Sequence, residues 1–215
     1  VYLWSRRLFG PAGGMLSLLL YALSPPFLAN GPLATVDVTA ALCFLLAVGA
    51  FWALLQKLTL RRLAASTAAT AALFVAKMSA VLLLPMMAVL LALRLAVRRP
   101  LPAAFGRERV LTGRAAQAGV LLGAVLAHAM VTVFTIWLFH GFRYSAFRAT
   151  AGPGQMLAVE WLHPDAAEGL VGHAVTFARE RRWLPEAYLC GFLHTFKSAE
   201  HRSAFLNGRY SLRGW

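Results

Sequence analysis

Asp37 and Lys77 are the side chains best placed to do chemistry, because each carries a charge beside a long apolar run. Asp37 opens the run DVTAALCFLL, and the next acidic residue along the chain is Glu108. Lys77 interrupts TAATAALFVAKMSAVLLLPMMAVLLAL. Ionisable residues at membrane depth are costly and usually pair with one another or face a protein interior. We therefore expect an Asp37–Lys77 contact.

Two roles are open for this pair. It can be a buried ion pair that fixes helix packing. It can also form the floor of an external cavity, where Lys77 binds a lipid phosphate as a point charge or holds Asp37 ionised and oriented for catalysis.

Arginines near the last apolar run are candidates for holding a lipid phosphate. Arg143 and Arg148 directly follow this run, and Arg182 lies in the cluster RERRW beside Trp183. Guanidinium groups bind phosphate through paired hydrogen bonds. The alternative is a basic and aromatic belt that anchors the segment to lipid headgroups.

The histidines give a weaker signal. His128 lies within LAHAMV, where we expect a hydrogen-bonded intramembrane histidine rather than a ligand. A divalent metal is a possible cofactor of the segment after residue 140, although no pair of side chains has convincing ligand spacing. The candidate ligands there are His163, His173, His194, His201, Glu160, Asp165 and Glu200.

The composition places these residues in a membrane protein. The chain of 215 residues is 60% hydrophobic and 13% charged, whereas soluble domains carry about 25% charged residues. Its apolar runs are long enough to cross a bilayer core of about 30 Å. The net charge of +13 comes from short arginine clusters between these runs. Such loop charges set the topology of membrane helices. A nucleic-acid-binding protein would instead carry them along one basic face, so we do not expect nucleic acid as a partner.

The apolar runs predict an all-α, polytopic transmembrane bundle over residues 1–139. Every Lys and Arg of this region except Lys77 falls on one side if the chain turns at Lys77, and the positive-inside rule makes that side cytoplasmic. Asp37 and Lys77 then lie at the external surface. The expected helices are 12–29, 37–56, 63–77, 78–95 and 116–139.

Residues 140–215 differ in character and follow an outward span, so we expect them outside the cytoplasm. The GPG at 152–154, Pro164 and Pro185 divide this segment into short pieces. The stretch AAEGLVGHAVTFARERRWL is amphipathic, as in helices that lie at a membrane interface.

Motifs of soluble enzymes, nucleotide-binding loops included, are missing. The two cysteines, in an apolar run and a polar region, imply no disulfide framework. The chain begins without Met or signal-peptide features and ends at Gly214-Trp215, and we interpret it as an internal piece of a longer protein.

Three stretches resemble one family: LYALSPPFLANGPLATVDVTAALCFLL, VAKMSAVLLLP and LPEAYLCGFLHTFKSAEHRSAFLNGRYSLRGW. They are similar to bacterial polyprenyl-phosphate-dependent glycosyltransferases of the GT-C class, the group of protein O-mannosyltransferases and aminoarabinose transferases. The resemblance runs through nearly the whole chain. It implies a multi-helix enzyme of the bacterial inner membrane that moves a sugar from a polyprenyl-phosphate donor, with inversion, in a cavity on the periplasmic side.

The resemblance also assigns residues. Asp37 matches an acidic residue beneath that cavity, Lys77 its basic partner, and His201, loosely, a histidine associated with metal in some relatives. The family's main catalytic carboxylate would precede Val1, so we expect the chain to be inactive alone. The sugar and the acceptor stay open.

Two other functions compete with this prediction. A transporter or flippase could use Asp37 as a proton or ion site, although no inverted repeat is visible. A non-catalytic membrane scaffold would use Asp37–Lys77 as a structural bridge.

Overall fold

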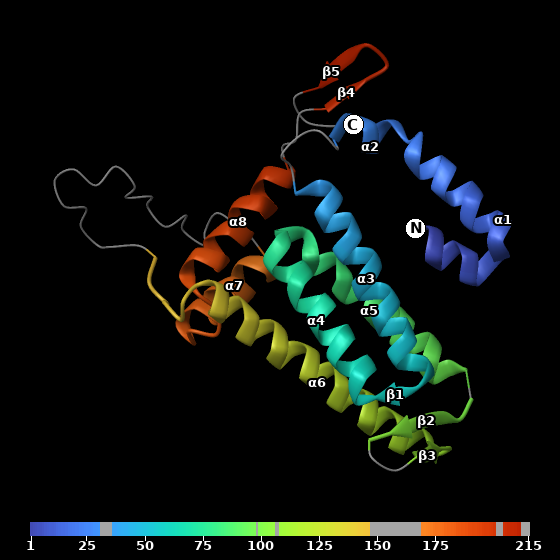
Figure 1. Ribbon diagram of the computed structural model, residues 1–215. Coiled ribbons are helices and arrows are strands. Elements are labelled where there is room, and N and C mark those ends of the chain that lie inside the picture. The colour runs from blue at the N-terminus through green and yellow to red at the C-terminus, as the bar shows by residue number, and fades with distance from the viewer. Residues whose placement is uncertain (31–35, 98, 106–107, 147–168, 201–203, 212–215) are drawn as a thin grey trace.

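The computed structural model describes residues 1–30, 36–97, 99–105, 108–146, 169–200 and 204–211. Within them, long helices form a bundle in which α4 packs between α3 and α6, and α5 packs on α3 (Figure 1). The core consists of apolar side chains that these helices bury, Phe51, Leu54, Leu73, Leu83 and Leu121 among them. The helices of the bundle are α3 (Asp37–Gln56), α4 (Leu60–Ala76), the 3-10 turn η1 (Met78–Leu82) with α5 (Leu83–Ala96), and α6 (Arg114–Phe139).

Among the described residues, three helical stretches are long and apolar enough to cross a membrane. They are Asp37–Gln56, Met78–Ala96 and Arg114–Phe139. The protein is therefore a multi-pass membrane protein with a predominantly helical fold, as its composition predicts. α4 has 17 residues, and it is the helix that the sequence predicted to be short.

The expected helix over 12–29 is wrong, because the chain forms two helices there. α1 (Tyr2–Ala22) ends before Ser24, and α2 (Pro25–Asn30) begins at a proline. Proline disfavours helical backbone in the residue before it but suits the first helical position. α1 is itself kinked at Gly10, whose φ of 75° lies in the left-handed region.

The loops at one end of the bundle form a small sheet that was not expected. β2 (Leu101–Ala104) pairs in parallel with β1 (Leu58–Thr59) and antiparallel with β3 (Glu108–Leu111), with Leu58 opposite Ala103 and Leu101 opposite Leu111.

Arg94, in the last turn of α5, fastens this end of the bundle. It is buried, and its Nε donates to the Leu55 carbonyl at 2.9 Å. Its Nη atoms donate to the carbonyls of Arg99 and Pro100, each at 3.2 Å. Arg94 thus supplies donors to carbonyls near the end of α3 and in the loop after α5.

The segment after residue 140 contributes two further helices, α7 (Leu170–Glu180) and α8 (Glu186–Glu200), and a hairpin of β4 (Ala204–Leu206) and β5 (Arg209–Ser211). Figure 1 shows that α8 crosses the end of the bundle opposite the three-stranded sheet. The start of α3 and the end of α4 lie at this same end.

Candidate active site

The ion pair expected between Asp37 and Lys77 is present. The Lys77 Nζ donates to the Asp37 Oδ1 across 40 residues of sequence. The Lys77 side chain is 33% exposed and that of Asp37 is 54% exposed, so the pair is open at the end of the bundle rather than buried in it. This exposure differs from the buried ion pair that is one of the two roles expected from the sequence.

Helix ends position both charges. Asp37 is the first residue of α3, and Lys77 directly follows the last residue of α4. A carboxylate is stabilised at a helix N-terminus and an ammonium at a C-terminus, because the helix dipole has its positive end at the N-terminus. Lys77 leaves the helical conformation (φ −156°, ψ 137°), and this break is the turn that the sequence predicted.

α8 holds the chain on both sides of Lys77. The Tyr188 hydroxyl donates to the Phe74 carbonyl at 3.2 Å, one of the carbonyls that a helix end leaves without an internal partner. After Lys77, the Met78 side chain packs against Gly191 of α8. A Cβ added to Gly191 would lie only 3.1 Å from the Met78 Cε. Burial raises the pKa of Tyr188 to about 12.

The first turn of α8 is anchored by a buried carboxylate. Glu186 is 6% exposed, and its Oε1 accepts from the Arg179 Nε at 3.1 Å and Nη2 at 2.9 Å. Its Oε2 accepts from the Ala146 N–H at 3.3 Å. The Tyr144 hydroxyl donates to the Arg179 carbonyl at 2.7 Å, so this contact ties α7 and α8 to the segment that follows α6.

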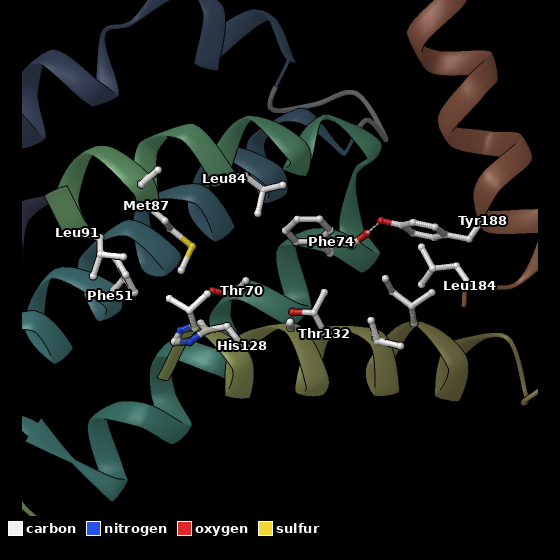
Figure 2. Close-up of a pocket in the computed structure, with 15 residues that line it drawn as sticks. Phe51, Thr70, Phe74, Leu84, Met87, Leu91, His128, Thr132, Leu184 and Tyr188 are labelled. Carbon is white, nitrogen blue, oxygen red and sulfur yellow. Dashed lines mark hydrogen bonds between the residues drawn. The ribbon is translucent and has the colours of Figure 1, made fainter. Parts of the chain in front are cut away.

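A cavity of about 380 Å³ lies below α8, between the helices of the bundle. Figure 2 shows its walls, with Leu84 and Met87 from α5, Phe74 from α4, and Leu184 and Tyr188 at the α8 end. The walls are mainly apolar, and their polar side chains come from α4, α6 and α8.

His128 on α6 is hydrogen-bonded within the bundle, as the sequence predicted. Its Nδ1 donates to the Ala124 carbonyl at 2.7 Å, so its Nε2 accepts from the Ser66 hydroxyl at 2.8 Å. It is 4% exposed. Cys43 and Cys190 are free thiols.

Two of the three arginines predicted to hold a phosphate, Arg143 and Arg182, lie in the described part of the chain. Arg182 lies over the Tyr144 ring at 5.2 Å, and Arg143 is exposed just after α6. Arg148 and His201 lie outside the described residues. Within the described ranges, no group of three His, Cys, Asp or Glu side chains is arranged to hold a metal ion.

Four residues of this region were not singled out from the sequence: Tyr188, Glu186, Thr70 and Thr132. Glu186 carried a signal, since it is a carboxylate after Pro185 in a basic segment. Tyr188 and the threonines gave none, because their roles depend on contacts between helices far apart in sequence.

Comparison with known proteins identifies a family match. Residues 1–107 match the family model described as dolichyl-phosphate-mannose-protein mannosyltransferase. No curated protein and no solved structure gives a significant match. The matched half of the chain includes both Asp37 and Lys77, and it supports the resemblance to mannosyltransferase-type proteins of the GT-C class.

Proposed function

We propose that this chain, whose residues 1–107 match the family model of dolichyl-phosphate-mannose-protein mannosyltransferases, acts in a membrane glycosyltransferase. It moves a sugar from a polyprenyl-phosphate donor to an acceptor at the external face of the bacterial inner membrane. The observation that carries this proposal is the exposed Asp37–Lys77 pair at the end of the apolar bundle, within the matched residues.

The position of the pair suits a lipid-linked donor. A polyprenyl chain lies in the bilayer while its phosphate stays at the interface, and the two charges meet where α3 begins and α4 ends. Transfer breaks the bond between the sugar C1 and the phosphate oxygen, and negative charge develops on the departing phosphate. A fixed cation beside that oxygen lowers the barrier, which is the role we assign to Lys77.

Asp37 acts through Lys77 in this scheme. Its carboxylate accepts a hydrogen bond from the ammonium and thereby fixes the position of Lys77. We assign Asp37 to supporting the site, and leave the removal of the acceptor proton to another base. Arg143 and Arg182 supply further positive charge at the end of α6 and are secondary candidates for the lipid phosphate.

The test follows release of polyprenyl phosphate from a labelled polyprenyl-phosphate sugar by the full-length protein in purified membranes. Lys77→Met should lower donor turnover by about 10²- to 10³-fold, the usual cost of removing one donor to a developing oxyanion. Asp37→Asn should lower it by about 10- to 100-fold, the worth of a hydrogen bond to a charged group.

The protein offers a matched control at the other end of the bundle. Lys57 Nζ and Glu108 Oε1 form an exposed ion pair at 2.7 Å beside the sheet, so Lys57→Met and Glu108→Gln should leave turnover unchanged. Equal losses from both pairs would make Asp37–Lys77 a structural contact. No turnover by the wild type with any donor would overturn the glycosyltransferase proposal in favour of a transporter or a scaffold.

A further inference from the structure

The turn between α7 and α8 presents cations and aromatic rings together on its surface. Phe177 and Trp183 are 45% and 59% exposed, and their rings meet edge to face with centroids 5.2 Å apart. The Arg181 guanidinium lies 5.3 Å from the centre of the Phe177 ring, and the Arg182 guanidinium lies 5.2 Å from that of Tyr144. We call Phe177, Arg181, Arg182 and Trp183 the turn patch.

The two arginines of the turn patch carry charge that the described residues do not neutralise. Arg179, in the last turn of α7, is paired with the buried Glu186 at 2.9 Å. Neither Arg181 nor Arg182 forms an ion pair with a carboxylate in the described ranges, although Glu180 is adjacent and exposed. Both guanidinium groups rest on aromatic faces, which leave N–H donors for an external acceptor. The turn patch therefore offers two cations to an anion.

Arg182 holds a backbone position that usually belongs to glycine. α7 ends in a Schellman motif, in which the Arg182 N–H donates to the Arg179 carbonyl at 3.0 Å and the Trp183 N–H to the Ala178 carbonyl at 2.9 Å. The φ of Arg182 is 51°, in the left-handed region that disfavours a side chain but not glycine. Glycine would close this helix with less strain, so the turn itself does not require an arginine here.

The turn patch lies at the level where α6 ends. The Trp137 Nε1 donates to the Trp183 carbonyl at 3.0 Å, and Trp137 is two residues before the end of α6 at Phe139. α6 is a candidate membrane span, and Figure 1 shows α7 and α8 at this end of it. At the end of a span, aromatic rings and arginines occupy the headgroup region, where guanidinium groups reach phosphates. The depth of the turn patch is thus that of lipid headgroups.

We propose that the turn patch binds the headgroup of an anionic bilayer phospholipid. The lipid phosphate accepts hydrogen bonds from Arg181 and Arg182, and the rings of Phe177 and Trp183 contact the upper part of the acyl chains. Charge complementarity selects anionic over zwitterionic lipids, because each guanidinium attracts the net negative charge. The inference does not depend on the glycosyltransferase proposal, although Arg182 is also a secondary candidate for the donor phosphate, and the experiment separates the two lipids.

Quenching of a fluorescent label at the turn patch tests the proposal in the full-length protein. In a cysteine-free background, with Cys43→Ser and Cys190→Ser, Trp183→Cys carries bimane, an apolar aromatic label, in place of the indole. The protein is reconstituted in vesicles of palmitoyl-oleoyl phosphatidylcholine. These vesicles also contain either phosphatidylglycerol or phosphatidylcholine with a nitroxide near the top of one acyl chain. The phosphatidylglycerol probe should show about tenfold higher affinity for the site beside the label, because two guanidinium groups attract its charge.

Variants of the two arginines assign this preference to them. Arg181→Gln and Arg182→Gly should each lower the preference for phosphatidylglycerol at the label by about fivefold. Arg182→Gly is also the folding control, because glycine relieves the left-handed backbone, and its thermal stability should equal or exceed that of the parent. Arg209→Gln is the matched control, since Arg209 is an exposed arginine of the β4–β5 hairpin, and it should leave the preference unchanged.

Other results would overturn the proposal. An absence of quenching by both probes would place the turn patch outside the bilayer. Equal quenching by the two probes, or a preference that both arginine variants retain, would show that the arginines do not select an anionic headgroup. Displacement of the phosphatidylglycerol probe by polyprenyl phosphate more effectively than by unlabelled phosphatidylglycerol would assign the arginines to the sugar donor instead.

Discussion

At the scale of single residues, the bundle contains an exposed ion pair at a helix end, Asp37–Lys77, and two buried hydroxyls without a partner among the described residues, those of Thr70 and Thr132. The Asp37–Lys77 pair could be expected because a lone acid and a lone base on the same side of a membrane have few other partners. The hydrogen bonds of His128 followed from its position inside an apolar run. Thr70 and Thr132 could not be found, because a threonine in a helix usually bonds to its own helix, and only the packing of α4 and α6 shows that these two do not.

Thr70→Val should stabilise the protein in detergent by about 1 kcal/mol. Valine keeps the shape of threonine and removes a buried hydroxyl that has no partner. Thr67 on the same helix is also buried, but its hydroxyl donates to the Ala64 carbonyl at 3.1 Å, so Thr67→Val should cost about 0.5–1 kcal/mol. Denaturant titration in detergent measures both values, and a loss of stability in Thr70→Val would show that its hydroxyl is bonded in the protein.

At the scale of elements, the long apolar runs predict the helices of the bundle. The structure differs from the prediction where prolines divide a helix and where strands far apart in sequence pair. The helices over 37–56 and 63–77, and the break at Lys77, could be predicted from run length and loop charge. The division of 12–29 could have been read from Pro25 and Pro26. The sheet could not be predicted from the sequence. β1 has two residues, too few to show the alternating pattern of a strand, and its partner β2 lies more than 40 positions away.

The contact between α8 and α4 should appear as a pH dependence of stability. The folded pKa of Tyr188 is about 12, above its ordinary value of 10.0, because the side chain is buried. Below pH 10 the phenol is neutral in both states. Between pH 10 and about 12 the unfolded state loses this proton first, so the free energy of unfolding should fall by about 2–3 kcal/mol over that interval.

Tyr188→Phe isolates this contribution. The variant should lose about 0.5–1.5 kcal/mol at pH 8, where the hydrogen bond to the Phe74 carbonyl is gone. It should also show a shallower decline between pH 10 and 12 than the wild type. Parallel curves for the two proteins would mean that the phenol is accessible to solvent and that α8 does not close over α4.

At the scale of the whole molecule, the two ends of the bundle differ in construction. One end carries the sheet, with Arg94 bonded to loop carbonyls and the Lys57–Glu108 pair. The other carries Asp37 at the start of α3 and Lys77 just after α4, and there α8 contacts η1. Among the described residues before 140, the basic ones lie in or beside the elements at the sheet end, apart from Lys77 and the pair Arg6-Arg7 in α1. The positive-inside rule predicts that the sheet faces the cytoplasm and α8 the outside.

Single cysteines at the two ends test this orientation. In a full-length background with Cys43→Ser and Cys190→Ser, Val110→Cys places a thiol on β3 and Leu170→Cys places one on α7, at positions that are 61% and 87% exposed in the native protein. A membrane-impermeant maleimide should label Leu170→Cys in cells with a permeabilised outer membrane and Val110→Cys only in inverted vesicles. Labelling of both from the same side would contradict the arrangement, because α6, a candidate membrane span, connects the two positions. Labelling in the reverse order would move the Asp37–Lys77 pair to the cytoplasmic face and would require a sugar donor presented there.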